Sequence, residues 1–201
     1  LAQRLYEQGY ITYMRTDSVN LSPESTASAK AVIAQKYGAK YTLEKPRFYK
    51  TRSQGAQEAH EAIRPTDPTK TPEDLSGLDD REQKLYRLIW QRMVASQATQ
   101  ARINSVRLTI DATKDTDTYT LTSSGSTIAF DGYLAISGTT IGDKEPLPEL
   151  SKGDALETRD VRAEEKTTSP PPRYTEASLV KVLEEYEIGR PSTYAPTIST
   201  L

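Results

Sequence analysis

Apolar positions recur at helical spacing through most of the first hundred residues. Ser22-Pro23-Glu24 combines an N-cap residue, a proline suited to the first helical position and an acid in the first turn. A helix is therefore predicted from this triplet to about Tyr37, where Gly38 can end it. A shorter helix is predicted over residues 58–64, because Pro65 cannot continue it.

A longer helix is predicted after Asp79-Asp80, where apolar residues again recur at helical spacing. The residues of that apolar face are predicted to be core: Leu85, Leu88, Ile89, Met93 and Val94. From about Val106 apolar and polar residues alternate, as in a strand, and β-branched residues dominate. This pattern predicts an antiparallel sheet that ends near Val161.

A proline-rich stretch, residues 164–172, separates the predicted sheet from the end of the chain and is expected to be an extended linker. A helix capped by Thr175 and ended by Gly189 is predicted next, and Pro191-Ser192-Thr193 is expected to open another. The fold class is therefore α+β. Three regions follow from this order: a helical domain over 1–100, part of a β-rich domain over 101–163, and a linker with the start of a second helical domain over 164–201.

The composition restricts the classes of site and the compartment. The 201 residues include no cysteine and one histidine, which argues against a zinc centre. No apolar run approaches the ~20 residues of a membrane helix, and no signal peptide is recognisable, so a cytoplasmic protein without membrane contact is expected. A net charge of -2 argues mildly against nucleic-acid binding, yet 26 Lys and Arg residues can gather locally.

The segment Gly9 to Ser18 (GYITYMRTDS) carries the most specific chemistry. In an extended conformation Tyr13 and Arg15 project to one side, with Ile11 anchoring that face. A tyrosine hydroxyl is a phosphorus nucleophile when it is assisted, and an arginine fork can hold the phosphate and offset developing charge. The alternative is a half-buried strand with a structural tyrosine, because this triplet is common.

The same segment resembles the active-site segment of type IA DNA topoisomerases through ten consecutive residues. Two further stretches resemble that family in the same order: QEAHEAIRP at residues 57–65 and GRPSTYA at residues 189–195. The resemblance spans nearly the whole chain and is closest to bacterial topoisomerase I. It implies a helical domain that bears Tyr13, followed by part of a β-rich arch domain.

The resemblance also implies roles for individual residues. Tyr13 is expected to attack the DNA backbone, with Arg15 and His60 as further catalytic residues near the scissile phosphate. Arg64, one helical turn after His60, is expected either to contact DNA or to form a salt bridge. Gln3, in the first helical pattern, matches a family position that approaches DNA.

GRPSTYA places backbone N–H groups, an arginine and two hydroxyls at a predicted helix N-terminus. Such an end can bind an anion, or Ser192 can simply cap the helix. By resemblance, Arg190, Ser192 and Thr193 lie along the groove that holds single-stranded DNA.

The family's reaction implies a 5′-phosphotyrosyl intermediate, strand passage and resealing without ATP, which relaxes negatively supercoiled DNA. Mg²⁺ is expected in the full-length enzyme, held by a Toprim domain outside this chain. No metal site is expected here, since Asp111, Asp115 and Asp117 lie near a turn and are expected to be solvated. The chain starts and ends within helical patterns, so we expect an inactive fragment of a longer polypeptide.

Three alternatives stay open at this point. Topoisomerase III and the topoisomerase half of reverse gyrase share the same active-site residues. A non-catalytic module that binds single-stranded DNA would need aromatic and basic residues interleaved along a groove. A purely structural arch would be indicated by a buried Tyr13.

Overall fold

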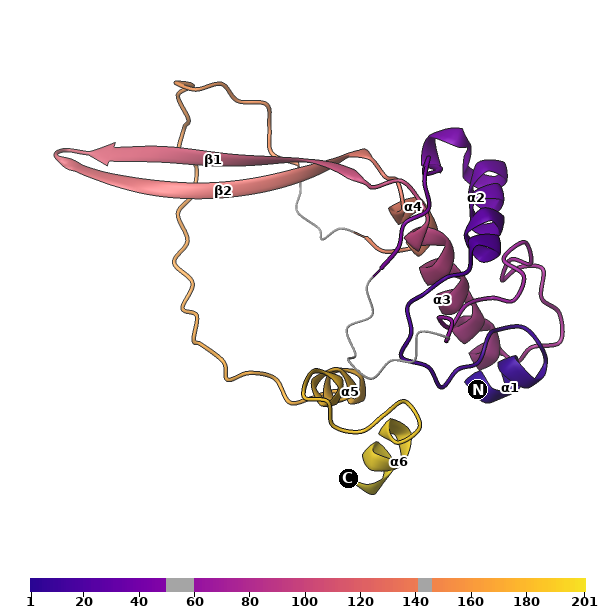
Figure 1. Cartoon of the computed structure of the whole chain (residues 1–201). Helices are drawn as coiled ribbons and strands as arrows, with labels where there is room; N and C mark the ends of the chain where they lie inside the picture. Colours follow the sequence, from indigo (N-terminus) through magenta and orange to yellow (C-terminus); the bar gives the residue numbers. More distant parts are fainter. Residues whose placement is uncertain (50–59, 141–145) are drawn as a thin grey trace.

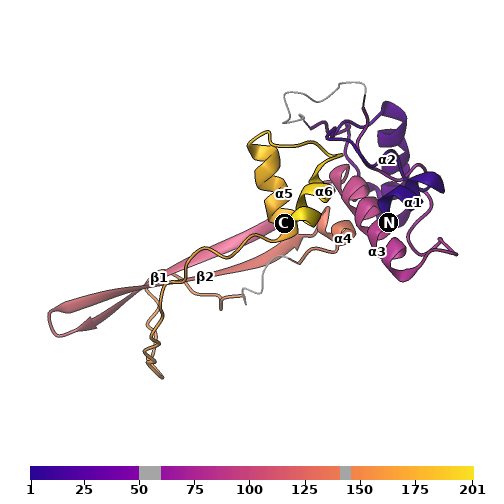
Figure 2. The same cartoon turned by 90° about the horizontal axis from the view of Figure 1, so that it is seen from below.

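The computed structural model describes residues 1–49, 60–140 and 146–201 (Figure 1). Its elements in chain order are α1 (Ala2–Glu7), α2 (Pro23–Tyr37), the 3-10 turn η1 (Ala39–Tyr41), α3 (Asp80–Ser96), β1 (Arg102–Lys114), β2 (Asp117–Phe130), α4 (Leu134–Ser137), α5 (Glu176–Glu185) and α6 (Tyr194–Thr200). A helical body holds α1 to α4, and the β1–β2 ribbon projects from it (Figures 1 and 2). The predicted α+β class is confirmed.

The first long helix forms where its local signals place it. Ser22 caps α2 by accepting a hydrogen bond from the backbone N–H of Ser25, and Pro23 occupies the first turn. Gly38, at a φ of 97°, ends the helix and donates its N–H to the carbonyls of Ile33 and Ala34. The prediction for this helix is confirmed at both ends.

Helix α3 begins at Asp80, close to its predicted start, and its first turn is closed by a capping box between Asp79 and Glu82. Its predicted core face is wrong at Leu88, whose side chain is 55% exposed. The buried face runs instead through Tyr86, Trp90 and Val94. The two aromatic side chains can be buried because each donates a hydrogen bond, at 2.8 Å in both cases, to a carbonyl of the preceding loop.

The core lies where α1, α2 and α3 meet. Its buried apolar members are Leu5, Ile11, Ala29, Val32, Ile33, Tyr86, Trp90, Met93, Val94, Ala95, Ala98 and Ile136. At its edge Arg4 pairs with the exposed Asp79 at 2.8 Å and with the buried Glu82 at 2.9 Å. These ion pairs join α1 to the start of α3, so the segment that follows α1 departs from a fixed position.

The helix predicted over 58–64 is wrong for residues 60–64, while residues 58 and 59 lie outside the described part of the chain. Residues 60–64 instead run beside the segment after α1. Thr12 donates its N–H to the Arg64 carbonyl at 2.9 Å, and Ile11 forms an antiparallel bridge with Pro65. Backbone pairing with a distant segment therefore outweighs local helix propensity here.

The sheet is shorter than predicted. Strands β1 and β2 form a two-stranded antiparallel ribbon, with Lys114 opposite Asp117 at its tip and Arg102 opposite Phe130 at its base. No further strand follows in residues 131–140 or 146–161, so the predicted end near Val161 is wrong. After Phe130 the chain turns back, and α4 buries Leu134 and Ile136 against the helical body.

Gly132 makes this return possible. Its φ is 52°, and a Cβ added to it would lie 2.6 Å from backbone atoms of Gln100 and Ala101. We expect Gly132→Ala to lower the free energy of unfolding by about 2–4 kcal/mol, because left-handed strain adds to backbone overlap. Denaturant unfolding measures this loss. Gly77→Ala, at a φ of 90° with open space around it, is the control for backbone strain alone. Equal losses of unfolding free energy in the two variants would show that contact with Gln100 and Ala101 adds nothing.

The C-terminal part largely follows its local signals. Residues 164–172 are exposed and without regular structure, as expected of a linker. Thr175 caps α5, although the helix ends at Glu185, before the predicted terminator Gly189. Helix α6 then begins after Pro191-Ser192-Thr193, as predicted. No helix of the described residues is long and apolar enough to cross a membrane.

Candidate active site

Tyr13 lies in an irregular segment that leaves α1 through a turn at Gly9, whose φ is 76°. Its side chain is 46% exposed, and its ring packs edge-on against Tyr6 with centroids 5.3 Å apart. Among the described residues nothing is hydrogen-bonded to its hydroxyl. Tyr13 is therefore not buried against core residues, and this exposure argues against the purely structural alternative.

Thr12 and Ile11 hold this segment in place. The Thr12 hydroxyl donates to the Ala62 carbonyl at 2.7 Å and accepts from the Arg64 N–H at 2.9 Å. Ile11 is 1% exposed, so its anchoring role is confirmed. The extended strand predicted here is limited to the bridge at Ile11, because the backbone bends at Thr12, Met14 and Arg15. Sequence reasoning missed Thr12, since its partners are about fifty positions away.

If Tyr13 is the DNA-cleaving nucleophile that the family resemblance implies, we expect Thr12→Val to reduce DNA cleavage by the full-length protein while leaving every reacting group in place. Valine has a similar shape but loses both hydroxyl hydrogen bonds, a cost of about 1–3 kcal/mol for part-buried groups. Cleavage rate at saturating DNA measures the effect. Thr12→Ser keeps the hydroxyl and is expected to recover most of that rate. An unchanged rate in Thr12→Val would show that the hydrogen bonds of the Thr12 hydroxyl do not position Tyr13.

Arg64 is engaged by protein groups. Its guanidinium makes a two-point ion pair with Glu61, both distances 2.8 Å, and donates to the Pro65 carbonyl. Glu61 also accepts from the Ser22 N–H at 3.0 Å. Burial opposes ionisation of Glu61, but the hydrogen bonds from Arg64 and Ser22 outweigh it and lower its pKa. These contacts match the salt-bridge alternative, and a DNA contact by Arg64 stays a prediction.

His60 and Arg15 are both exposed, and neither has an ion-pair partner in the described part of the chain. His60 stands two positions before Ala62, whose carbonyl receives the Thr12 hydroxyl. The hydrogen bond from the Thr12 hydroxyl to the Ala62 carbonyl therefore holds the QEAHEAIRP motif beside the segment that carries Tyr13. Residues 57–59 of that motif lie outside the described residues.

The third motif forms a tight turn before α6. The Thr193 hydroxyl accepts from the Arg190 N–H at 2.8 Å and donates to the Arg190 carbonyl at 3.1 Å. Ser192 is exposed and is not the N-cap of α6, which is Thr193. Gln3 is occupied by an i,i+4 hydrogen bond to Glu7 on the exposed face of α1.

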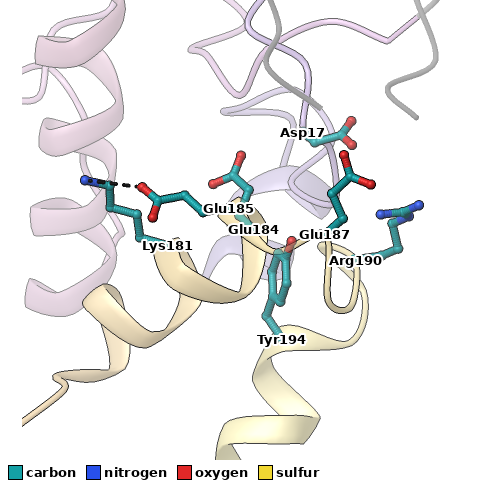
Figure 3. Close-up of a pocket in the computed structure, with 7 residues that line it drawn as sticks. All are labelled: Asp17, Lys181, Glu184, Glu185, Glu187, Arg190 and Tyr194. Carbon is teal, nitrogen blue, oxygen red and sulfur yellow. Dashed lines mark ion pairs between the residues drawn. The ribbon is translucent and has the colours of Figure 1, made fainter. Parts of the chain in front are cut away.

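A cleft of about 290 Å³ joins the first motif to the third (Figure 3). It is lined by Asp17, Lys181, Glu184, Glu185, Glu187, Arg190 and Tyr194. Lys181 is paired with Glu185 at 3.8 Å, whereas Arg190 has no carboxylate partner among the described residues. Burial and the charges of Glu184 and Asp17 raise the pKa of Tyr194, and Arg190 opposes them only in part.

This cleft is lined by four carboxylates and two cations, so its net negative charge repels a phosphate group. Arg190 is the lining cation that has no carboxylate partner in the described part of the chain and can attract a phosphate. Sequence reasoning missed Asp17 and the glutamates of α5, because only the fold brings α5 to the segment of Tyr13. The described residues contain no group of three or more His, Cys, Asp or Glu side chains able to hold a metal ion.

Comparisons with known proteins show the family of this chain. A family model described as DNA topoisomerase matches residues 1–201. DNA topoisomerase 1 of Streptomyces coelicolor is 48% identical and that of Vibrio cholerae 47% identical, each over 100% of this chain and 22% of the relative. The solved structure of full-length topoisomerase I from Thermotoga maritima is 37% identical, with a TM-score of 0.84 over 100% of this chain and 33% of that one.

The chain thus spans 22% of the length of these curated relatives. The matching model covers all three motifs, and the structural match includes the helical body and the ribbon. On both grounds the chain belongs to the bacterial type IA DNA topoisomerase family, with topoisomerase I proteins as its relatives.

Proposed function

We propose that, in the longer polypeptide, this chain supplies the nucleophile that breaks one DNA strand. The Tyr13 oxygen attacks a backbone phosphorus, a 5′-phosphotyrosyl bond forms, and the bond to the 3′ oxygen breaks to leave a 3′-hydroxyl. The observation that carries this proposal is the half-exposed side chain of Tyr13, on a segment fixed by Thr12 and Ile11. One phosphoester bond replaces another, so the 3′-hydroxyl can reverse the step without ATP.

Passage of a second strand through the break, followed by resealing, would relax negatively supercoiled DNA. Such DNA is favoured because underwinding supplies single-stranded segments. The proposal takes single-stranded DNA as the bound substrate and negatively supercoiled duplex as the overall one. Topoisomerase I is preferred to topoisomerase III and reverse gyrase because the similar proteins above carry the topoisomerase I name.

The remaining roles follow from exposure and charge. Arg15 would hold the scissile phosphate, with His60 beside it as a donor. Arg190, Ser192 and Thr193 would contact the strand before the cleavage point, and Gln3 would approach it from α1. Mg²⁺ would be held by the Toprim domain outside this chain and would neutralise charge beside the broken ends.

The proposal is tested by the polarity of the covalent product. The full-length protein is incubated with a single-stranded oligonucleotide labelled at either end, and the mixture is then denatured. A 3′ label is expected to stay on the protein, while a 5′ label is released on a fragment that ends in a 3′-hydroxyl. Recovery of the label on the peptide that contains Tyr13 would complete the test; a labelled protein from the 5′ label would contradict the proposed linkage.

We expect Arg15→Lys to impair cleavage by about tenfold or more while changing DNA affinity little. Lysine keeps the charge but loses the planar two-point contact with phosphate, which matters most in the transition state. Single-turnover cleavage and equilibrium binding, measured on the same oligonucleotide, separate the two effects. Cleavage by Arg15→Lys at the wild-type rate would show that Arg15 does not hold the scissile phosphate in the transition state.

A further inference from the structure

Two cations share one aromatic ring at the base of the β1–β2 ribbon. Lys40 Nζ lies 5.1 Å from the ring centroid of Tyr41 and 5.5 Å from that of Phe130. The guanidinium carbon of Arg102 lies 5.5 Å from the same Phe130 centroid. The two rings contact each other, with centroids 5.0 Å apart. We call these four residues the ribbon-base cluster.

Several hydrogen bonds fix the backbone of this cluster. The Thr99 N–H donates to the Tyr41 carbonyl at 2.9 Å, and the Thr99 hydroxyl donates to the Lys40 carbonyl at 3.1 Å. Arg102 and Phe130 are opposite each other in the ribbon. The cluster therefore joins η1 to both strands at the point where the ribbon leaves the helical body (Figure 1).

Asp131, which follows Phe130 in the chain, forms no ion pair with these cations and is engaged by Tyr41. Asp131 accepts the Tyr41 hydroxyl at 2.7 Å, a hydrogen bond that raises the pKa of Tyr41. Neither Lys40 nor Arg102 forms an ion pair with any described residue, and both side chains are exposed. By contrast, Arg4, Arg64 and Arg87 each have a carboxylate partner.

Two like charges on one ring repel each other, and an anion between them removes that repulsion. We propose that the ribbon-base cluster is a second binding site for the DNA backbone, in which Lys40 and Arg102 contact phosphate groups. The aromatic pair orients the two cations by cation–π attraction and does not need to stack on a base. The ribbon face that continues from Arg102 holds no acid before Asp117 at the tip, so the strand meets little repulsion near the cluster.

This inference rests on the proposed function, because it takes DNA as the ligand. It adds a contact outside the three motifs, on the junction between the helical body and the ribbon. A strand held there would couple DNA occupancy to the position of the ribbon. The contact is to phosphate, so it is expected to be independent of base sequence.

The test measures binding of a long single-stranded oligonucleotide to full-length protein over a range of salt concentrations. Lys40→Gln with Arg102→Gln is expected to weaken binding at low salt and to reduce the salt slope by about 1.4, at about 0.7 per lost single-strand phosphate contact. The matched control is Arg81→Gln with Lys84→Gln, which removes the same charge from exposed positions on α3. The control slope is expected to stay at its wild-type value.

Lys40→Arg with Arg102→Lys keeps both charges and is expected to keep the wild-type slope, which separates lost phosphate contact from altered folding. A cluster variant that binds like wild type, or a control pair that loses as much, would overturn the proposal. The Tyr13 adduct is measured in parallel on the wild-type protein and on the Arg81 and Lys84 control pair, where it is expected. Its absence from the wild-type protein would reject the proposed function, whereas an unchanged slope with the adduct present rejects only the second site.

Discussion

Replacing Tyr13 with phenylalanine in the full-length protein is expected to reduce the covalent DNA adduct and relaxation to background. The substitution removes only the attacking oxygen. That oxygen has no hydrogen-bond partner among the described residues, and the side chain is 46% exposed. The ring contact with Tyr6 is kept, so we expect the free energy of unfolding to change by no more than about 0.5 kcal/mol. Adduct after denaturation, plasmid relaxation and thermal unfolding measure these three quantities.

Tyr6 provides the matched control. It is 42% exposed, it belongs to α1, and its ring is the one against which Tyr13 packs. Tyr6→Phe removes an equivalent hydroxyl at the same place and is expected to keep cleavage near the wild-type level. An adduct that survives in Tyr13→Phe but is lost in Tyr6→Phe would show that Tyr6, and not Tyr13, is the nucleophile.

The helix ends could be predicted because their causes are local. Ser22, Asp79 and Thr175 each cap a helix through side-chain and backbone groups within three positions. The segment 60–64 could not be predicted in the same way. Its conformation is set by Thr12, whose hydroxyl and backbone replace the hydrogen bonds that a helix would have made.

The other errors in the fold have the same origin. Tyr86 and Trp90 displace Leu88 from the core because loop carbonyls of Lys70 and Pro68 satisfy their polar atoms. The sheet ends at Phe130 because the chain must pass within contact of Gln100 and Ala101. Neither the loop nor the close approach is visible in the period of apolar residues, which reports local geometry alone.

For the site, the role of Tyr13 as nucleophile stays a prediction, and its surroundings could be predicted only in part. The ten-residue motif identified Tyr13 through family resemblance, and its exposure is consistent with that role. The pairing of Arg64 with Glu61 could be expected from their i,i+3 spacing, but the spacing did not decide between salt bridge and DNA contact. The approach of Asp17 to the α5–α6 turn depends on packing between segments far apart in the chain.

The isolated 201-residue chain is expected to form no covalent adduct, with or without Mg²⁺. A phenol is mostly protonated at neutral pH, so attack needs an acceptor for its proton and a donor for the leaving 3′ oxygen. In the described structure no side chain accepts from the Tyr13 hydroxyl. His60 and Arg15 can steady a phosphate, but they do not together supply both proton transfers, and the described residues hold no three-ligand metal group. The chain also spans only 22% of its curated relatives.

Weak DNA binding is nevertheless expected from this chain, because Arg15, Arg190 and the two cations of the ribbon-base cluster, Lys40 and Arg102, all belong to it. That affinity should fall as salt rises, since it comes from phosphate neutralisation. The experiment incubates the folded chain with end-labelled single-stranded oligonucleotide, denatures it and examines the protein for label, with the full-length protein as positive control. A labelled chain that loses its label in Tyr13→Phe would show that all the groups needed for cleavage lie within these residues, and the division of the active site between this chain and a Toprim domain would be wrong.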